Sequence, residues 1–167
     1  DVQFLNTVEL NGFFALDKQG DTLVDVGSLK VELASIRDLL KKEITISSVA
    51  LSDGVVKIYK PEGSDQFNFA FIIDFFSTAK KKEKKPIPAI RLEDIELKNI
   101  RFHFDNYNYP LTAHGIDYSH LLLKDVNLKV SQFLMKNGIF SGIINNLSAF
   151  EQKSNFRINE LKTRAVF

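Results

Sequence analysis

The chain has 167 residues, of which 44 % are hydrophobic and 26 % charged, a composition that excludes a disordered chain and is ordinary for a domain with a core. Lys and Arg outnumber Asp and Glu by 22 to 21, and the net charge of +1 provides no general attraction for nucleic acid or an anionic membrane. The absence of cysteine excludes disulfides, thiolate metal sites and a cysteine nucleophile.

Alternating apolar and polar residues predict half-buried strands from the start of the chain. Residues 2–16 follow this period, and Leu29, Val31 and Leu33 repeat it with Lys and Glu between them. Residues 18–21 carry the turn signal that separates the two strands. A β-rich fold is therefore expected.

Two helices interrupt the predicted strands. A short connector over residues 36–42 follows the capping residue Ser35 and ends in two lysines. A second helix over residues 67–79 follows Asp65 and is apolar almost all round, so it needs cover on several sides. It is either a core helix that crosses the sheet or a lid on the surface that a lipid or partner would use. The side chains expected to form this lid or plug are Phe69, Ile72, Ile73 and Phe76.

A lysine-rich stretch over residues 80–89 follows this helix and ends in Pro86 and Pro88. The prolines favour an exposed, solvated linker. The alternative is contact with anionic lipid head groups, at about 1 kcal/mol for each basic residue close to the surface. The basic residues concerned are Lys80, Lys81, Lys82, Lys84 and Lys85.

An internal repeat relates the regions on either side of this linker. The pattern Ile44-x-Ile46-x-x-Val49-x-Leu51 aligns without gaps on Ile90-x-Leu92-x-x-Ile95-x-Leu97, at an offset of 46 residues. Each copy, like shorter echoes elsewhere in the chain, shifts the alternation by one residue. This shift predicts either a bulge that keeps the apolar residues on one face or a break between two strands. Chance similarity among strands is the competing explanation.

These patterns predict a mainly β fold with two short helices, arranged as a curved, elongated antiparallel sheet with an apolar concave face that needs neighbouring strands to cover it. We expect a first module over residues 1–79, the linker, and a second module over residues 90–167. Because strand pattern runs to both ends, we expect the chain to be a segment of a larger protein. The repeat disfavours a small closed lipocalin-like barrel. The predicted groove residues are Ile44, Ile46, Val49, Leu51, Ile90, Leu92, Ile95 and Leu97.

Residues that could carry catalysis are scarce. His103, His114 and His120 show no zinc-type spacing and follow no nucleophile motif, and His103 should face away from its two Phe neighbours on a strand. Residues 114–120 are expected to be a polar surface loop. We therefore expect a protein that is not an enzyme and needs neither metal nor cofactor.

The order and spacing of several segments resemble the N-terminal region of TamB-like translocation and assembly module proteins of Bacteroidetes, within the AsmA-like superfamily. The resemblance covers nearly the whole chain. In one late segment Asn155 stands where that group usually has glycine, and both residues tolerate positive φ. The segments that carry the resemblance are residues 6–10, 19–23, 29–31, 38–42, 67–74, 95–102 and 147–156.

The resemblance implies a function in the bacterial envelope. Such proteins are anchored to the inner membrane, cross the periplasm as an elongated β structure with a hydrophobic groove, and serve outer-membrane biogenesis through phospholipid transport or outer-membrane protein assembly. A phospholipid is then the expected ligand, and an outer-membrane barrel protein is a partner reached through regions that this sequence lacks. The alternative is a protein-interaction scaffold whose apolar face is closed by helix 67–79.

Overall fold

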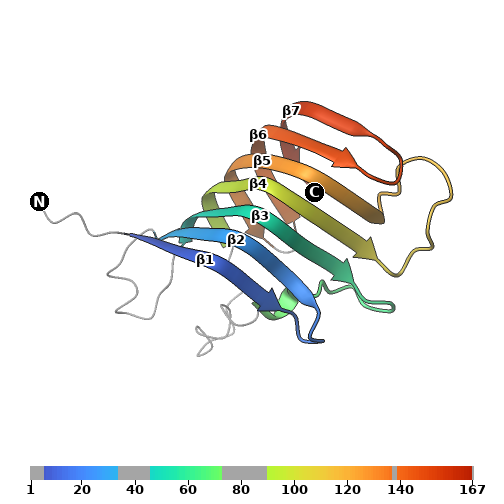
Figure 1. Cartoon of the computed structure of the whole chain (residues 1–167), viewed down its shortest axis with the longest axis horizontal. Helices are drawn as coiled ribbons and strands as arrows, with labels where there is room; N and C mark the ends of the chain where they lie inside the picture. Colours follow the sequence, from blue (N-terminus) through green and yellow to red (C-terminus); the bar gives the residue numbers. More distant parts are fainter. Residues whose placement is uncertain (1–5, 34–45, 73–89, 137–138, 167) are drawn as a thin grey trace, which may run out of the picture.

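The computed structural model describes residues 6–33, 46–72, 90–136 and 139–166. Seven strands lie side by side in chain order in one sheet (Figure 1). The mainly β fold is therefore confirmed. Within the described part of the chain, β1 and β7 each pair on one side only, which leaves the sheet open. The strands are β1 (Thr7–Leu16), β2 (Thr22–Leu33), β3 (Ile46–Lys60), β4 (Ile90–Asn106), β5 (His120–Lys136), β6 (Ile139–Glu151) and β7 (Arg157–Val166).

The sheet is mixed, so the prediction of a purely antiparallel sheet is wrong at one place. β3 and β4 run parallel, whereas the other five neighbouring pairs are antiparallel. Parallel neighbours need a long crossover because the chain must return to the edge where it began. Residues 61–89 make this return, whereas a short turn suffices between β1 and β2.

The internal repeat corresponds to this parallel pair. Leu51 lies opposite Leu97 and Val49 opposite Ile95, so residues that are 46 positions apart are neighbours along the whole of the pairing. A gap-free repeat can align in this way only when its two copies run in the same direction. The offset read from the sequence is the register of the β3–β4 pair.

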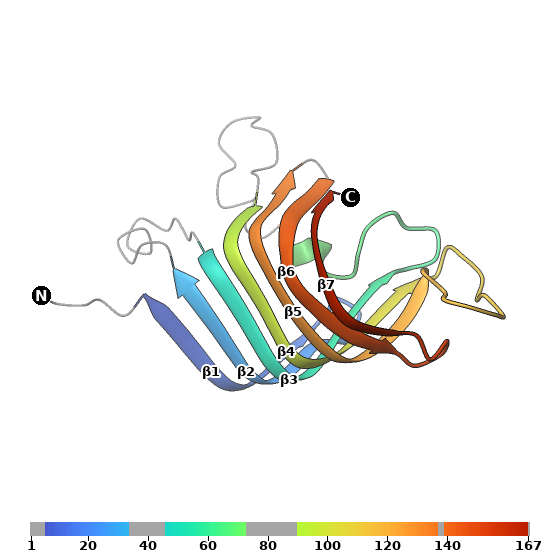
Figure 2. The same cartoon turned by 90° about the horizontal axis from the view of Figure 1, so that it is seen from above.

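Each strand bends near its middle, which turns the sheet into a trough (Figure 2). The bend coincides with residues of positive φ in four of the strands, at Gly12 in β1, Asp53 in β3, Asn99 in β4 and Asp125 in β5. The strands continue through these positions. β3 and β4 also continue through the shifts predicted between Ile46 and Val49 and between Leu92 and Ile95, so those shifts are not breaks between strands. Across the parallel pair, Asn99 Nδ2 donates a hydrogen bond of 2.7 Å to Asp53 Oδ1.

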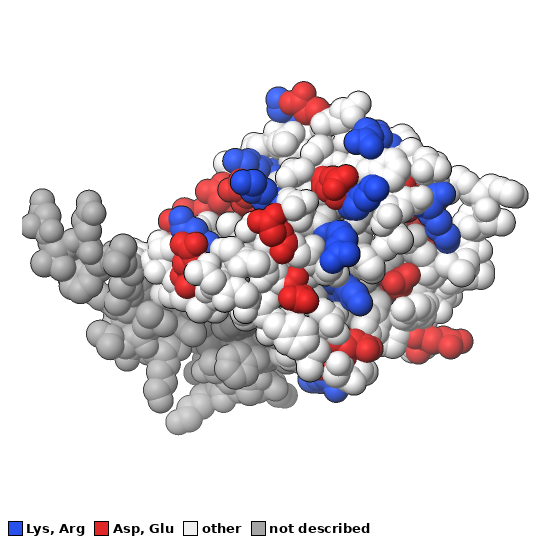
Figure 3. Space-filling view, in the orientation of Figure 1, with Lys and Arg blue, Asp and Glu red and all other residues white. Residues whose placement is uncertain are grey.

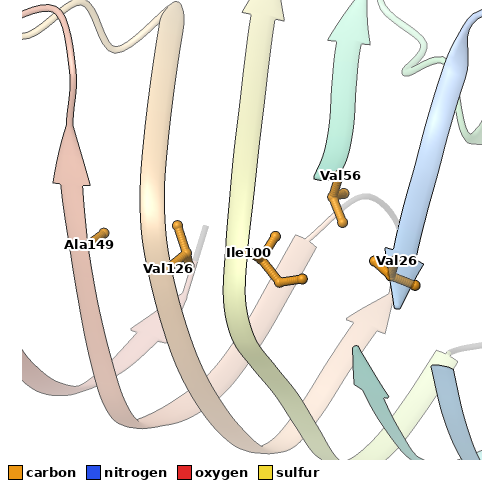
Figure 4. Packing of buried hydrophobic residues seen from close by; sticks show 5 residues of the cluster. All are labelled: Val26, Val56, Ile100, Val126 and Ala149. Carbon is orange, nitrogen blue, oxygen red and sulfur yellow. The ribbon is translucent and has the colours of Figure 1, made fainter. Parts of the chain in front are cut away.

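The buried core lies beside this bend. Ile100, which is 0 % exposed, directly follows the positive-φ residue of β4, and Val126 follows that of β5. With Val26, Val56 and Ala149 they form a cluster contributed by five neighbouring strands (Figure 4). Since the sheet is a single layer, the bend itself provides the cover that a second layer supplies in a sandwich.

The predicted helices are only partly within the described residues. Residues 70–72 are helical, whereas residues 73–79 and the predicted connector helix 36–42 lie outside the described part of the chain. The linker residues 80–89 lie outside it as well. Strands from both predicted modules share the one sheet. A search of the described residues finds no helix that is both long and apolar enough to cross a membrane.

Candidate binding surface

A row of leucines crosses one face of the sheet, with one leucine from every strand. Each leucine lies opposite the next in the strand register, so all seven side chains project from the same face. With neighbouring strands about 4.8 Å apart, the six intervals give the row a length of about 29 Å. This leucine row consists of Leu10, Leu29, Leu51, Leu97, Leu128, Leu147 and Leu161.

A second row runs beside it on the same face, two residues from the leucine in six strands and three residues from it in β6, where the register shifts between Ile144 and Leu147. All seven members are β-branched, and six of them are Val or Ile. Such residues suit a pleated surface because their χ1 angles are already restricted. This β-branched row consists of Val8, Val31, Val49, Ile95, Val130, Ile144 and Thr163.

The leucine row is less buried than the core beside the bend. Its five inner members are half-buried, and its end members Leu10 and Leu161 are 44 % and 39 % exposed. Ile100 in the neighbouring row is 0 % exposed. Within the described part of the chain, the two rows therefore form a continuous apolar surface that is not packed under a second layer.

Four of the predicted groove residues belong to these rows. Val49 and Ile95 are neighbours in the β-branched row, and Leu51 and Leu97 are neighbours in the leucine row. Ile44 lies outside the described residues. The remaining three lie nearer the strand ends, opposite apolar residues of β2 and β5, and are Ile46, Ile90 and Leu92.

The opposite face of the sheet carries charges of both signs. One row there reads Glu9, Lys30, Ala50, Glu96 and Lys129 across the first five strands. Lys129 Nζ lies 3.1 Å from Glu96 Oε1, with both side chains about half exposed, so this ion pair contributes little to stability. Figure 3, in the orientation of Figure 1, shows positive and negative groups interspersed over the strands.

A shallow hollow of about 330 Å³ lies on this charged face, over the small side chains Ser48 and Ala50. Glu32 and Asp94 stand at its border, and Ser48 Oγ donates a hydrogen bond of 2.8 Å to Glu32 Oε2. Among the described residues no group of three or more His, Asp or Glu is placed to hold a metal ion.

The apolar face is partly covered near the C-terminal end of β3. Figures 1 and 2 show the helical turn at residues 70–72 on the inner side of the bent sheet. The Phe67 ring lies 6.4 Å from that of Phe104 on β4 and is stacked on Phe69 at 5.2 Å. Of the predicted lid residues, Phe69 is half-buried and Ile72 is 38 % exposed, whereas Ile73 and Phe76 lie outside the described residues.

Asn68 fixes this covering segment to the sheet. Its backbone N–H donates to Tyr59 O, its Oδ1 accepts from Tyr59 N, and its Nδ2 donates to Lys57 O and to Asp17 Oδ2, all between 2.9 and 3.2 Å. Burial raises the pKa of the Asp17 carboxyl, but the hydrogen bonds that it accepts, led by that from Tyr59, outweigh burial and lower the pKa overall. The sequence pattern gave no signal for this anchor, because an asparagine amid phenylalanines has no characteristic spacing.

A second group of buried polar side chains lies along the same strand ends. Asp117 accepts from Thr112 N at 2.8 Å and lies 3.2 Å from His120 Nδ1, and Lys153 Nζ is 3.6 Å away. The Thr112 N–H lowers the pKa of Asp117 most; burial opposes this shift and His120 adds to it. Glu151 is buried nearby, with its carboxylate capping the N–H groups of the β6–β7 turn.

These groups bind the backbone N–H groups of the turns beside them. The predicted polar loop is exposed at His114 and Tyr118, whereas Asp117 and His120 are buried, so the prediction of a surface loop is wrong for these two residues. The Asp-x-x-His spacing was visible, but burial here depends on the turn geometry. His103 lies in register with Lys57 on the charged face, and burial, followed by Lys57, lowers its pKa.

Comparison with protein-family models, with curated proteins and with solved structures finds no match to this chain.

Proposed function

We propose that this chain provides a hydrophobic trough that holds the acyl chains of phospholipids, as a periplasmic segment of an inner-membrane-anchored AsmA/TamB-like protein in outer-membrane biogenesis. The observation that carries the proposal is the leucine row, which crosses all seven strands and is only half-buried. The trough acts by binding and needs no chemical step.

The proposal assigns the two apolar rows to the concave side of the bend. The convex side faces the viewer in Figures 1 and 3, and it is the side on which charged groups are interspersed. The ring contact between Phe67 and Phe104, with the helical turn at residues 70–72 on the inner side of the bend in Figure 2, supports the same assignment. Head groups would then stay in water at the mouth of the trough.

The dimensions of the trough suit a lipid. The row is about 29 Å long, whereas one leaflet of a bilayer, half of a hydrocarbon core of about 30 Å, needs only about 15 Å. Each methylene removed from water contributes about 0.8 kcal/mol. Because the leucines are alike from strand to strand, an acyl chain has little reason to prefer one position along the row.

Chemistry favours a lipid over an unfolded outer-membrane protein as the ligand of the rows. A polypeptide brings backbone N–H and C=O groups that cost free energy when buried without partners, and the rows offer apolar side chains at every position except Thr163. An acyl chain brings no such groups. A protein client fits an open sheet edge better, because an edge offers hydrogen bonds.

A pair of neighbouring residues on opposite faces tests the proposal. A photocrosslinking amino acid replaces Leu128 in the leucine row or Lys129 on the charged face, and each protein is irradiated with phosphatidylethanolamine–phosphatidylglycerol vesicles. We expect lipid adducts, detected by mass spectrometry, at position 128 and several-fold fewer at position 129. Equal yields at the two positions contradict the proposal.

The contacts at Phe67 and Asn68 favour a second candidate, a scaffold whose apolar face is closed by its own segment 67–79 and which binds only proteins. Mass spectrometry of lipids retained after gentle purification separates the two functions. Phospholipid that co-purifies with the chain supports the trough. The scaffold is supported if no phospholipid co-purifies and the yield of lipid adducts at position 128 is no higher than at position 129.

A further inference from the structure

A row of basic residues crosses the charged face of the sheet beyond the bend, towards the C-terminal end of β4. Lys124 of β5 lies opposite Phe150 of β6, and Phe150 lies opposite Arg157 of β7. On β4, Arg101 projects from this face beside Lys124, because the residues before and after it belong to the apolar face. Figure 3 shows Lys and Arg side chains following one another across this part of the sheet. This basic row consists of Arg101, Lys124, Phe150 and Arg157.

The ring of Phe150 holds two of the cations in place. Lys124 Nζ and Arg157 Cζ each lie over this ring, 4.9 Å from its centroid, and they come from the strands on either side of it. The negative face of an aromatic ring attracts a cation at this distance. The two charges are therefore positioned before a ligand arrives, which lowers the entropy that binding costs.

The charges of the basic row are not neutralised by carboxylates of the described residues. Among those residues, none of the three cations forms an ion pair with a carboxylate. Arg101 and Arg157 are exposed and Lys124 is half-buried. The row is therefore a local positive site on a chain whose net charge is only +1.

Lys57 of β3 adds positive charge next to the row. It lies opposite His103, which follows Arg101 by two residues and so projects from the same face of β4. Burial lowers the pKa of His103 most, and Lys57 and Arg101 lower it further, whereas Asp105 raises it. The positive potential of the row therefore extends to β3.

The surroundings of the basic row favour a narrow anion over a broad anionic surface. Asp25 lies on the same face two strands before Arg101, Asp125 directly follows Lys124, and Asp105 lies beyond His103. A bilayer would face these carboxylates together with the cations, and a flat surface touches the convex side of the bend only along a line. A ligand no wider than one extended chain can follow the row and meet mainly positive charge.

Chemistry favours an acidic peptide over a nucleic acid or an acidic polysaccharide. Bases bind protein surfaces by stacking on aromatic rings, but the Phe150 ring already carries a cation on either side. The same cover removes the ring as a platform for a sugar. Carboxylates accept charge-assisted hydrogen bonds from guanidinium and ammonium groups without needing the ring. From Arg101 to Arg157 the row spans three strand intervals, about 14 Å, which is the length of about four residues of extended chain.

We infer that the basic row is a docking site for an acidic segment of a partner protein. In an extended segment every second side chain projects to the same side, about 7 Å apart, so carboxylates two residues apart can reach cations at different points of the row. The site lies on the outer side of the bend and leaves the trough free for its own ligand. The inference does not rest on the proposed function.

A synthetic peptide tests the charge requirement. The probe is a fluorescein-labelled peptide of alternating glutamate and valine, and fluorescence anisotropy measures its binding to the chain. We expect the same peptide with glutamine in place of glutamate to bind about tenfold more weakly or less, because it cannot form charge-assisted hydrogen bonds.

Charge reversals locate the site. Arg101→Glu and Arg157→Glu should each weaken binding of the glutamate peptide about fivefold or more, since each replaces an attraction by a repulsion. Lys30→Glu is the matched control, because it makes the same change of charge at an exposed position of the same face outside the row, and it should leave the affinity unchanged.

Phe150→Leu separates the positioning of the cations from their charge. The variant keeps every cation but removes the ring, so the peptide should bind about threefold more weakly. The dependence of its affinity on salt concentration should stay the same, whereas Arg157→Glu should reduce that dependence.

Three results would overturn the inference. They are no preference for the glutamate peptide over the glutamine peptide, equal losses in Arg101→Glu and Lys30→Glu, and binding to phosphatidylglycerol vesicles or to heparin that depends on Arg101 and Arg157 more strongly than peptide binding does. Circular dichroism shows whether each variant has folded. Lipid adducts at position 128 should be the same in Arg157→Glu, so failure of this site and failure of the trough can be told apart.

Discussion

Truncation of Ile100 and Leu97 to alanine should have very different costs, although the two residues lie on the same face of β4. Ile100 is fully buried, and removing a buried aliphatic side chain to alanine costs about 2–5 kcal/mol because transfer and cavity terms add. We expect about 3–4 kcal/mol for Ile100→Ala. Leu97 is half-buried in the leucine row, so about half of the transfer term and little cavity term apply, which gives about 1–2 kcal/mol.

Urea denaturation followed by circular dichroism measures both variants against the unmodified chain. The contrast between them reports whether the leucine row is covered. Equal losses of more than about 3 kcal/mol at both positions would refute the open surface, because a half-solvated leucine lacks the contacts to account for that loss. If phospholipid fills the trough, its addition should stabilise the unmodified chain more than Leu97→Ala.

Three further predictions concern the rest of the sheet. The pKa values of Asp117 and Glu151 are lowered in the folded chain, so the two carboxylates stabilise the fold at pH values above their ordinary pKa values of 3.8 and 4.5. The urea midpoint should therefore fall as the pH drops below about 4.5. A midpoint that stays constant down to pH 3 would contradict this. Asn68→Ala should destabilise the chain by about 2 kcal/mol, because it leaves the hydrogen-bonding groups around Asn68 unpaired. The Phe67 contact should be lost as well, which limited proteolysis would detect as faster cleavage around residues 61–72. Unchanged resistance to urea and to protease would contradict the role of Asn68 as an anchor. A Cβ at Gly54 would lie 2.1 Å from a carbonyl oxygen of β2, so Gly54→Ala should destabilise the chain by more than about 3 kcal/mol. The matched control Gly27→Ala, whose Cβ would have its nearest contact at 3.4 Å, should cost less than about 1.5 kcal/mol. Thermal unfolding measures both losses, and similar losses would show that the strands adjust freely.

The alternation predicted the strands because each has one face against the core and one in water. In β5 the shift in alternation also located the bend, because the break in period between Leu123 and Val126 coincides with the positive φ of Asp125. In β3 and β4 the shifts predicted within the repeat lie before Asp53 and Asn99. The strands, and the position of the bend in β5, could therefore be predicted from local sequence.

Strand direction did not follow from local pattern, because parallel and antiparallel strands of a half-exposed sheet show the same alternation. The 46-residue offset contained the answer, since two repeats in register side by side have to run in the same direction. The buried carboxylates escaped prediction for a different reason. Asp117 is buried because a turn folds its N–H groups around it, and the residues concerned read as an ordinary polar loop.

No single position in the two apolar rows requires one particular residue type. Each row needs one side chain of suitable shape from every strand, and the β-branched row already mixes Val, Ile and Thr. Exchanges among aliphatic residues of similar volume usually cost less than about 1.5 kcal/mol. Such a trough can keep its shape while one aliphatic residue replaces another in the rows. The positions that tolerate the fewest residue types are then those where two backbones lie in close contact, such as Gly54.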